Sequence, residues 1–165
     1  MLFGRGVAIA IFLSGIFTGF AQSDSAPPVA RPNFSGTWKL NLQRSGPIMP
    51  RGLEALTIVI NHRDPSITSH ETRVVSGKVT ESNDDTAEID GIEHVSHPEP
   101  DSTIKQRQAW SGATLLKHWE KTVNDTTYIS DIKQTLSEDS KLMIMSERYR
   151  EPGMERMRDW VFEKQ

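Results

Sequence analysis

The feature that most limits this 165-residue chain is an absence, because it contains no cysteine. That absence excludes structural disulfides, and it also excludes the lipid-bearing cysteine that tethers a bacterial lipoprotein to a membrane. A hydrophobic core must therefore stabilise the fold on its own. The chain is long enough to form one such core in a single domain.

Long hydrophobic runs are scarce, and the one present lies at the N-terminus. Residues 1–21 combine the basic Arg5, an apolar stretch and small residues near Ala21, which is the pattern of a signal peptide cleaved after Ala21. A transmembrane anchor is the alternative, but a spanning helix needs about 20 apolar residues, and this run is shorter and interrupted by glycines. We expect a secreted or periplasmic protein whose mature chain has no integral membrane segment.

The distribution of proline divides the rest of the chain. Residues 22–32 are rich in Pro, Ser and Ala, which predicts an extended tether between the signal peptide and the domain. The folded domain is then expected over residues 33–165. No proline occurs between Asp101 and Glu151, so we expect that stretch to be the most regular part of the fold.

Segments with β-prone residues, separated by turn residues, run through the whole domain. Ser111-Gly112 divides one pair of segments in the proline-free stretch and residues 137–140 divide another, so two hairpins are expected there. About eight to ten short, evenly spaced strands in one all-β domain favour a barrel or a sandwich. The segments are 36–42, 53–61, 66–76, 78–89, 103–110, 115–123, 126–136, 141–149 and 156–164.

Charge of one sign is also lacking, because the net charge is only −3. Nucleic acid is therefore not an expected partner. Near the C-terminus, basic and acidic residues alternate, which predicts a solvated, salt-bridged face rather than a phosphate-binding patch. A helix is the alternative for residues 154–161, but Pro152-Gly153 marks a turn and Trp160-Val161-Phe162 is β-prone, so we expect a strand. The basic residues in question are Arg148, Arg150, Arg156 and Arg158.

Three short segments follow one another in an order known from one superfamily. Gly36-Thr37-Trp38-Lys39-Leu40 opens the domain, Gln108-Ala109-Trp110-Ser111-Gly112 forms a late hairpin, and Trp160-Val161-Phe162 lies near the end. They resemble the calycin superfamily, the lipocalins and the intracellular fatty-acid-binding proteins, in which Gly-x-Trp, Gln-x-Trp-Asp-Gly and Arg-x-Tyr stand at these places. The opening also resembles small exported bacterial proteins of lipocalin-like type. Residues 43–101 show no such likeness.

The resemblance implies a calycin-like, antiparallel up-and-down β-barrel, as a single domain after the signal peptide. The residues themselves agree with it. Gly36 allows a sharp turn into the floor of a barrel, and Trp38 can close that end while its indole N–H finds a partner. In calycins this tryptophan packs against a cationic side chain of the last strand, which implies Arg158 or Lys164 here.

A barrel of this size can enclose one small ligand, and alternation along the strands indicates which side chains point inward. The inward set mixes apolar and polar groups, as an amphipathic ligand requires, although a barrel filled by its own side chains is the alternative. The predicted pocket-lining residues are Ile58, Ile60, Gln106, Gln108, Trp110, Trp119, Arg158, Trp160 and Phe162.

One departure from the family bears on the ligand. The Arg-x-Tyr pair that holds a fatty-acid carboxylate in the family is replaced by Trp160-x-Phe162, so that route is lost unless Arg158 takes it over. The sequence predicts an exported, non-catalytic protein that holds a small hydrophobic or amphipathic molecule inside its barrel. The alternative is an exported interaction module, such as an inhibitor or an envelope assembly factor, with a filled barrel and an envelope protein as partner.

Motifs for catalysis and metal binding are also lacking. The chain has no nucleophile elbow, phosphate loop or zincin helix, so neither an enzyme nor a cofactor is expected. His94 and His97 are weak candidates for a zinc site, because they are expected in a proline-flanked loop, and no metal site is predicted. The remaining histidines, His62, His70 and His118, are isolated and are expected to be hydrogen-bonded or on the surface.

Overall fold

The computed structural model describes residues 30–82 and 84–165, which form one antiparallel sheet of eleven strands. The predicted signal peptide, residues 1–21, and most of the predicted tether lie outside the described residues. Across the described ranges, no helix is long and apolar enough to cross a membrane. The strand expected at the C-terminus in place of a helix is confirmed as Met154–Lys164.

The strands are connected in simple succession along the chain. Their bounds are β1 Gly36–Leu40, β2 Leu53–Arg63, β3 Ser66–Val75, β4 Lys78–Glu81, β5 Asp85–Glu88, β6 His94–Glu99, β7 Ser102–Ser111, β8 Thr114–Val123, β9 Thr126–Leu136, β10 Leu142–Glu151 and β11 Met154–Lys164.

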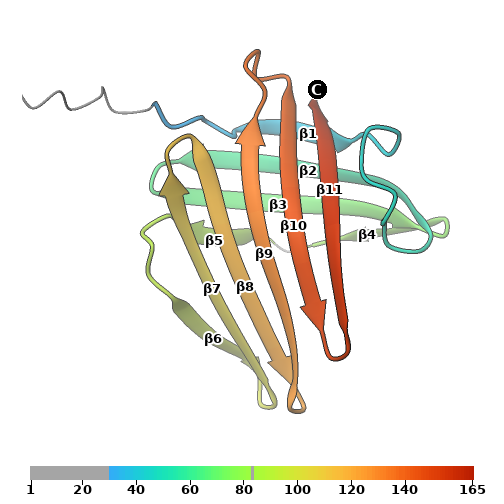
Figure 1. Ribbon diagram of the computed structural model, residues 1–165, viewed down its shortest axis with the longest axis vertical. Helices are drawn as coiled ribbons and strands as arrows, with labels where there is room; N and C mark the ends of the chain where they lie inside the picture. Colours follow the sequence, from blue (N-terminus) through green and yellow to red (C-terminus); the bar gives the residue numbers. More distant parts are fainter. Residues whose placement is uncertain (1–29, 83) are drawn as a thin grey trace, which may run out of the picture.

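The sheet order is β4-β3-β2-β1-β11-β10-β9-β8-β7-β6, with β5 paired to β3 beside β4. Figure 1 shows β7–β11 running down the front of the molecule while β1–β3 cross behind their upper halves. Pairing of β1 with β11 joins the two layers, so one continuous sheet wraps around an interior. The predicted all-β, calycin-like architecture is confirmed.

Two local differences raise the strand number above the predicted eight to ten. Residues 78–89 form two short strands, because the ladder on β3 is interrupted at Ser82, whose side chain and backbone N–H both bind the backbone of Glu71. The segment His94–Glu99, expected as a loop, is the edge strand β6. All six of its residues are exposed and it includes Pro98, which an edge strand tolerates because one side of it lacks a ladder partner.

One end of the barrel is filled, and we call it the floor. Trp38 is fully buried, its indole N–H donates to the carbonyl of Phe34 at 2.8 Å, and the Lys164 ammonium lies 5.2 Å from its ring centroid. Lys164 therefore supplies the cation of the last strand that the resemblance implied. Gly36, at φ +140°, leads into this end, where an added Cβ would lie 2.8 Å from the Lys164 side chain. Gly36 and Trp38 both lie at this floor, the end of the barrel at which the sequence predicted them.

The ladder around the barrel does not close. Within the described ranges no ladder pairs β5 or β4 with β6 or β7. The seam is bridged instead by a hydrogen bond of 2.8 Å from the Gly91 N–H to the carbonyl of Gln108. At the floor, the Trp110 indole N–H donates to Asp64 Oδ1 at 2.9 Å, which ties β7 to the β2–β3 turn.

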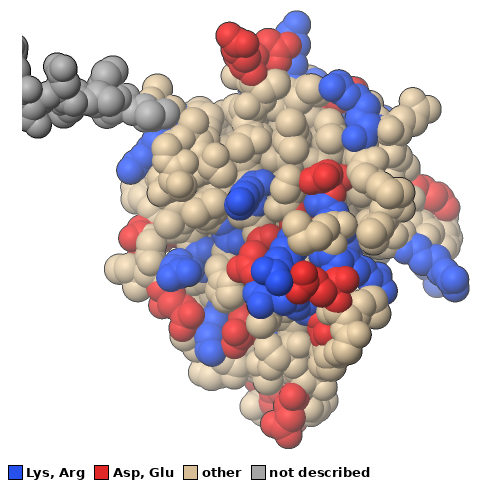
Figure 2. Space-filling view, in the orientation of Figure 1, with Lys and Arg blue, Asp and Glu red and all other residues tan. Residues whose placement is uncertain are grey.

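Charged residues on the outside of β7–β11 are interleaved, as the sequence predicted. Figure 2 shows basic and acidic side chains intermixed over the middle of this face. Arg148 pairs with Glu155 at 2.8 Å and Arg150 with Asp131 at 2.5 Å. Arg156 and Arg158 lie on the inner face instead, because each pairs with an inward residue of β10, and Arg158 lies 3.7 Å from Glu147.

Candidate functional site

Three rows of cross-strand neighbours line the inner face of β7–β11. The row nearest the floor is mostly apolar: Trp110, Leu115, Gln134, Met145 and Trp160. The middle row is mostly polar: Gln108, Lys117, Ile132, Glu147 and Arg158. The third row is Gln106, Trp119, Ser130, Tyr149 and Arg156. Because side chains alternate between the two faces of a strand, every member of these rows shares one face.

A cavity of about 470 Å³ lies against the middle and third rows. The opposite wall comes from β3 and β5, through Ser69, Glu71, Arg73 and Asp85. Trp119, Ile132, Met145 and Trp160 give it apolar surface. The interior is therefore not filled by its own side chains.

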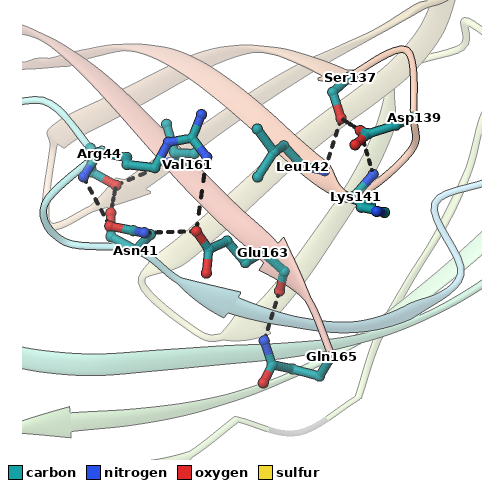
Figure 3. Close-up of polar contacts among 10 residues, drawn as sticks. Asn41, Arg44, Ser137, Asp139, Lys141, Leu142, Val161, Glu163 and Gln165 are labelled. Carbon is teal, nitrogen blue, oxygen red and sulfur yellow. Dashed lines mark hydrogen bonds and ion pairs between the residues drawn. The ribbon is translucent and has the colours of Figure 1, made fainter.

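The chain between β1 and β2 contributes Pro50 to the cavity and is fixed to β11 (Figure 3). Asn41 Nδ2 donates to Glu163 Oε1 at 2.8 Å, and Asn41 Oδ1 accepts the Arg44 backbone N–H at 2.9 Å. The Val161 N–H in turn donates to Ser45 Oγ at 3.0 Å. These bonds hold the first half of the β1–β2 connection at the edge of the barrel.

Glu147 organises the polar side of the cavity. Its Oε1 accepts from Ser130 Oγ at 2.7 Å and its Oε2 accepts from the Trp160 indole N–H at 3.0 Å. Arg158 lies 3.7 Å from the same carboxylate and stacks over the Tyr149 ring at 4.9 Å. Its Nε is buried without a partner in the described part of the chain. Arg158 is thus already engaged by an anion and an aromatic ring.

Lys117 occupies the centre of the middle row, between Gln108 and Ile132. In the described part of the chain, its ammonium makes no hydrogen bond or ion pair, although it faces the cavity. Burial lowers the pKa of Lys117 to about 8, while Asp85 and Glu71 oppose that shift by stabilising the charged form. Gln108, its neighbour on β7, has a buried Oε1 that likewise finds no partner among the residues that the structure describes.

The charged groups around the cavity balance one another. Arg73 pairs with Glu71, and Arg158 pairs with Glu147. Lys117 is attracted by Asp85 and Glu71 without contacting either. A ligand with a net charge would disturb this balance, whereas an uncharged polar group can bind to the open hydrogen-bonding atoms without doing so.

The structure brings five of the predicted pocket residues together around the cavity: Gln106, Gln108, Trp119, Arg158 and Trp160. Their contact with a ligand stays a prediction. The other four, Ile58, Ile60, Trp110 and Phe162, do not line it, because at the floor the two layers pack directly onto each other. Lys117 and Glu147 were not predicted as pocket residues, although strand alternation places Lys117 opposite Gln108. Alternation indicates which side chains point inward, but it does not indicate which of the polar ones form hydrogen bonds with a partner.

Trp110 belongs to a stacked cluster at the floor. Its ring lies 6.1 Å from Phe34 and 5.9 Å from His62, centroid to centroid. His62 Nδ1 accepts the Phe34 backbone N–H at 3.2 Å. Its Nε2 has no hydrogen-bond partner within residues 30–82 and 84–165 and lies 4.0 Å from Asp64 Oδ1. The cluster also holds Arg31, which pairs with Asp64 at 2.8 Å. Trp110 therefore helps to close the barrel.

The two weak metal candidates are held separately. His94 Nε2 is 2.9 Å from Asp90 Oδ2, and His97 Nδ1 is 3.2 Å from Thr103 Oγ1. Over residues 30–82 and 84–165, no three histidine or carboxylate side chains converge as metal ligands would. His94 and His97 lie in the edge strand β6, not in the loop that was expected.

A second hollow, of about 670 Å³, lies on the outer face of β7–β11. One row of cross-strand neighbours crosses it: Arg107, His118, Asp131, Arg148 and Met157. His118 Nδ1 lies 2.7 Å from Asp131 Oδ1, which also pairs with Arg150. The prediction that His118 is hydrogen-bonded is confirmed. Asp131, the acidic residue that lines this hollow, is already paired with Arg150.

A single antiparallel sheet wrapped around an interior, with a glycine-led first strand and a tryptophan closing the floor, defines a calycin-like fold. Among solved structures, the chain is similar to a secretary abundant heat soluble protein from Ramazzottius varieornatus, at 14% identity and a TM-score of 0.50, covering 80% of this chain and 95% of that one. It is also similar to a fatty acid binding protein from Schistosoma mansoni in complex with arachidonic acid, at 12% identity and a TM-score of 0.46, covering 80% of this chain and 96% of that one.

At these identities the likeness concerns the fold alone. No family model matches the sequence, and no curated protein does either.

Proposed function

We propose that this chain is a non-catalytic binding protein that holds a small, uncharged amphipathic molecule in its interior cavity. The observation that carries the proposal is the cavity of about 470 Å³, in which apolar walls adjoin polar atoms that lack partners among the described residues. A polar headgroup supplies those partners, and an apolar tail covers Trp119, Ile132 and Met145. The alternative of an interaction module assumed a filled barrel, which the cavity disfavours.

Charge balance argues against a free carboxylate as the headgroup. Arg158 is the residue that would replace the Arg-x-Tyr pair, but Glu147 already lies 3.7 Å from it. A carboxylate bound there would meet Glu147 as a like charge in a site largely withdrawn from water. An alcohol, amide or carbonyl group meets no such repulsion.

Calorimetric titration with three ten-carbon probes, 1-decanol, decanoate and decylammonium, tests the proposal. We expect 1-decanol to bind and each charged probe to bind at least about tenfold more weakly, since an uncompensated buried charge costs more than 1.4 kcal/mol. Ile132→Trp fills the cavity from the middle row and should abolish binding. Lys133→Trp adds the same ring one residue along β9, on the outer face, and should leave binding unchanged.

Two results would contradict the proposal. One is the absence of 1-decanol binding to folded protein. The other is binding that survives Ile132→Trp as well as it survives Lys133→Trp, because the ligand would then lie outside the cavity.

We also propose that the protein acts outside the cytoplasm, which rests on the signal-peptide pattern of residues 1–21. Expression of the full chain in a bacterial host, followed by N-terminal sequencing of the exported fraction, tests this. We expect a mature chain beginning at Gln22. Protein recovered only from the cytoplasm with residues 1–21 intact would overturn it.

A further inference from the structure

Lys117 differs from the other lysines of β7–β9 in its surroundings. On the outer face, Lys105 donates to Glu120 at 2.9 Å, and this hydrogen bond raises its pKa. Lys117, on the inner face, has no such bond in the part of the chain that the structure describes, and its side chain faces the cavity. An amine that is partly buried, unpaired within the described residues and directed into a cavity is available to react with what the cavity holds.

Several titratable and charged groups surround this amine and affect its pKa. They are Glu71 and Arg73 on β3, Asp85 on β5, His62 on β2, Glu147 on β10 and Arg158 on β11. Burial outweighs the carboxylates among them and lowers the Lys117 pKa to about 8. At pH 7.4, Lys117 then has on the order of a hundredfold more uncharged, nucleophilic amine than a solvated lysine.

The cavity also provides apolar surface for the tail of a ligand that could react with this amine. Trp119 and Ile132 flank the amine with apolar surface, on its own strand and on β9, and Met145 extends that surface to β10. The tail of an amphipathic ligand can lie there with its polar head at Lys117. Among uncharged headgroups, aldehydes and ketones condense directly with a lysine amine, and the aldehyde is the more reactive of the two because its carbonyl carbon is less hindered.

We propose that Lys117 is a covalent capture site, whose Nζ condenses with the aldehyde group of a ligand bound in the cavity. The Nζ lone pair adds to the carbonyl carbon, the carbonyl electron pair moves to oxygen, and one N–H proton is transferred to that oxygen. The resulting carbinolamine loses its hydroxyl together with the second N–H proton as one molecule of water. A C=N bond then joins Lys117 to the ligand, with no change of oxidation state.

This inference rests on the proposed function, because capture requires an occupied cavity. The test incubates the folded protein with decanal and sodium cyanoborohydride, which reduces the imine to a stable secondary amine, and locates the decyl group by peptide mass mapping. We expect Lys117 to be labelled at least about tenfold faster than the outer-face Lys133. Labelling should rise with pH, with a midpoint near the Lys117 pKa of about 8.

Variants separate capture in the cavity from surface chemistry. Lys117→Arg keeps the charge but removes the primary amine, and should eliminate the fast-labelled site. If the Lys117→Arg protein does not fold, Lys117→Met is the variant to test in its place. Ile132→Trp should slow labelling of Lys117, whereas Lys133→Trp should not. Labelling of Lys117 no faster than Lys133, or unaffected by Ile132→Trp, would overturn the inference.

The two proposals fail in different ways. If 1-decanol binds but decanal does not label Lys117 preferentially, covalent capture is wrong and the binding function stands. If neither probe acts on the cavity, both are wrong.

Discussion

The floor and the cavity are built from the same strands, yet one is solid and the other hollow. At the floor, Phe34, Trp38, Leu115, Met143 and Phe162 are almost completely buried. Two to four residues further along the same strands, the inward residues become Lys117, Glu147 and Arg158, and a cavity opens. Apolar side chains can pack directly against one another, whereas charged ones must keep room for partners. The floor therefore stabilises the fold and leaves the other half free for binding.

The largest expected effect comes from emptying the floor. Trp38→Ala should lower the free energy of unfolding by about 3–5 kcal/mol, because it removes a fully buried ring and leaves a void among packed residues. Trp119→Ala, which only enlarges an existing cavity, should cost roughly half as much or less. Urea denaturation measures both. Equal losses for the two variants would mean that the floor is no better packed than the cavity wall.

The second-largest effect on stability is expected at Glu147, the carboxylate on the polar side of the cavity. Glu147→Gln should cost about 2–3 kcal/mol, since it leaves Arg158 inside the barrel without a counter-charge. Glu155→Gln removes a carboxylate from an exposed pair with Arg148 on the outer face and should cost less than about 0.5 kcal/mol. Thermal or urea unfolding of the two variants measures both losses of stability. A cost for Glu155→Gln that matched Glu147→Gln would contradict the assignment of inner and outer rows.

The sequence predicted the floor better than the cavity, for a physical reason. Gly36 and Trp38 act through local geometry and burial, which short motifs and alternation reveal. The cavity depends on hydrogen bonds between residues distant in sequence, such as those of Glu147 with Ser130 and Trp160. The pattern of residues within a single strand does not predict such pairs. Ile58 and Phe162 were assigned to the pocket because alternation indicates the inward face but not the height along the barrel. The edge strand β6 was not predicted, because Pro98 and Pro100 indicated a loop and the β-strand pattern of this segment is weak.

Raising the pH should stabilise the cavity half through Lys117. Its folded-state pKa of about 8 lies below the unfolded value of about 10.4, so between these values the unfolded chain binds the extra proton and stability rises with pH. Below pH 8 both states are protonated and the contribution is constant and unfavourable. Lys117→Met should be more stable at pH 7 and should lose the rise above pH 8. The free energy of unfolding from pH 7 to 10 tests this, and an unchanged slope in the variant would refute it.

The floor should respond in the opposite pH range, through His62. Burial lowers the pKa of His62, the positive charge of Lys117 adds to the shift, and Asp64 opposes it. The unfolded chain therefore takes up the proton first as the pH falls below about 6.5, and stability declines until the folded ring is protonated too. Protonation also converts Nδ1 into a donor, which deprives the Phe34 N–H of its acceptor.

His62→Gln keeps an acceptor for Phe34 but cannot titrate, so its free energy of unfolding should change less between pH 7.5 and 5 than that of the natural chain. His70→Gln removes a histidine whose side chain is 37% exposed on β3 and should leave the decline in place. If both variants decline alike, the acid sensitivity lies outside the floor, and the assignment of the acid response to the floor and of the alkaline response to the cavity would no longer hold.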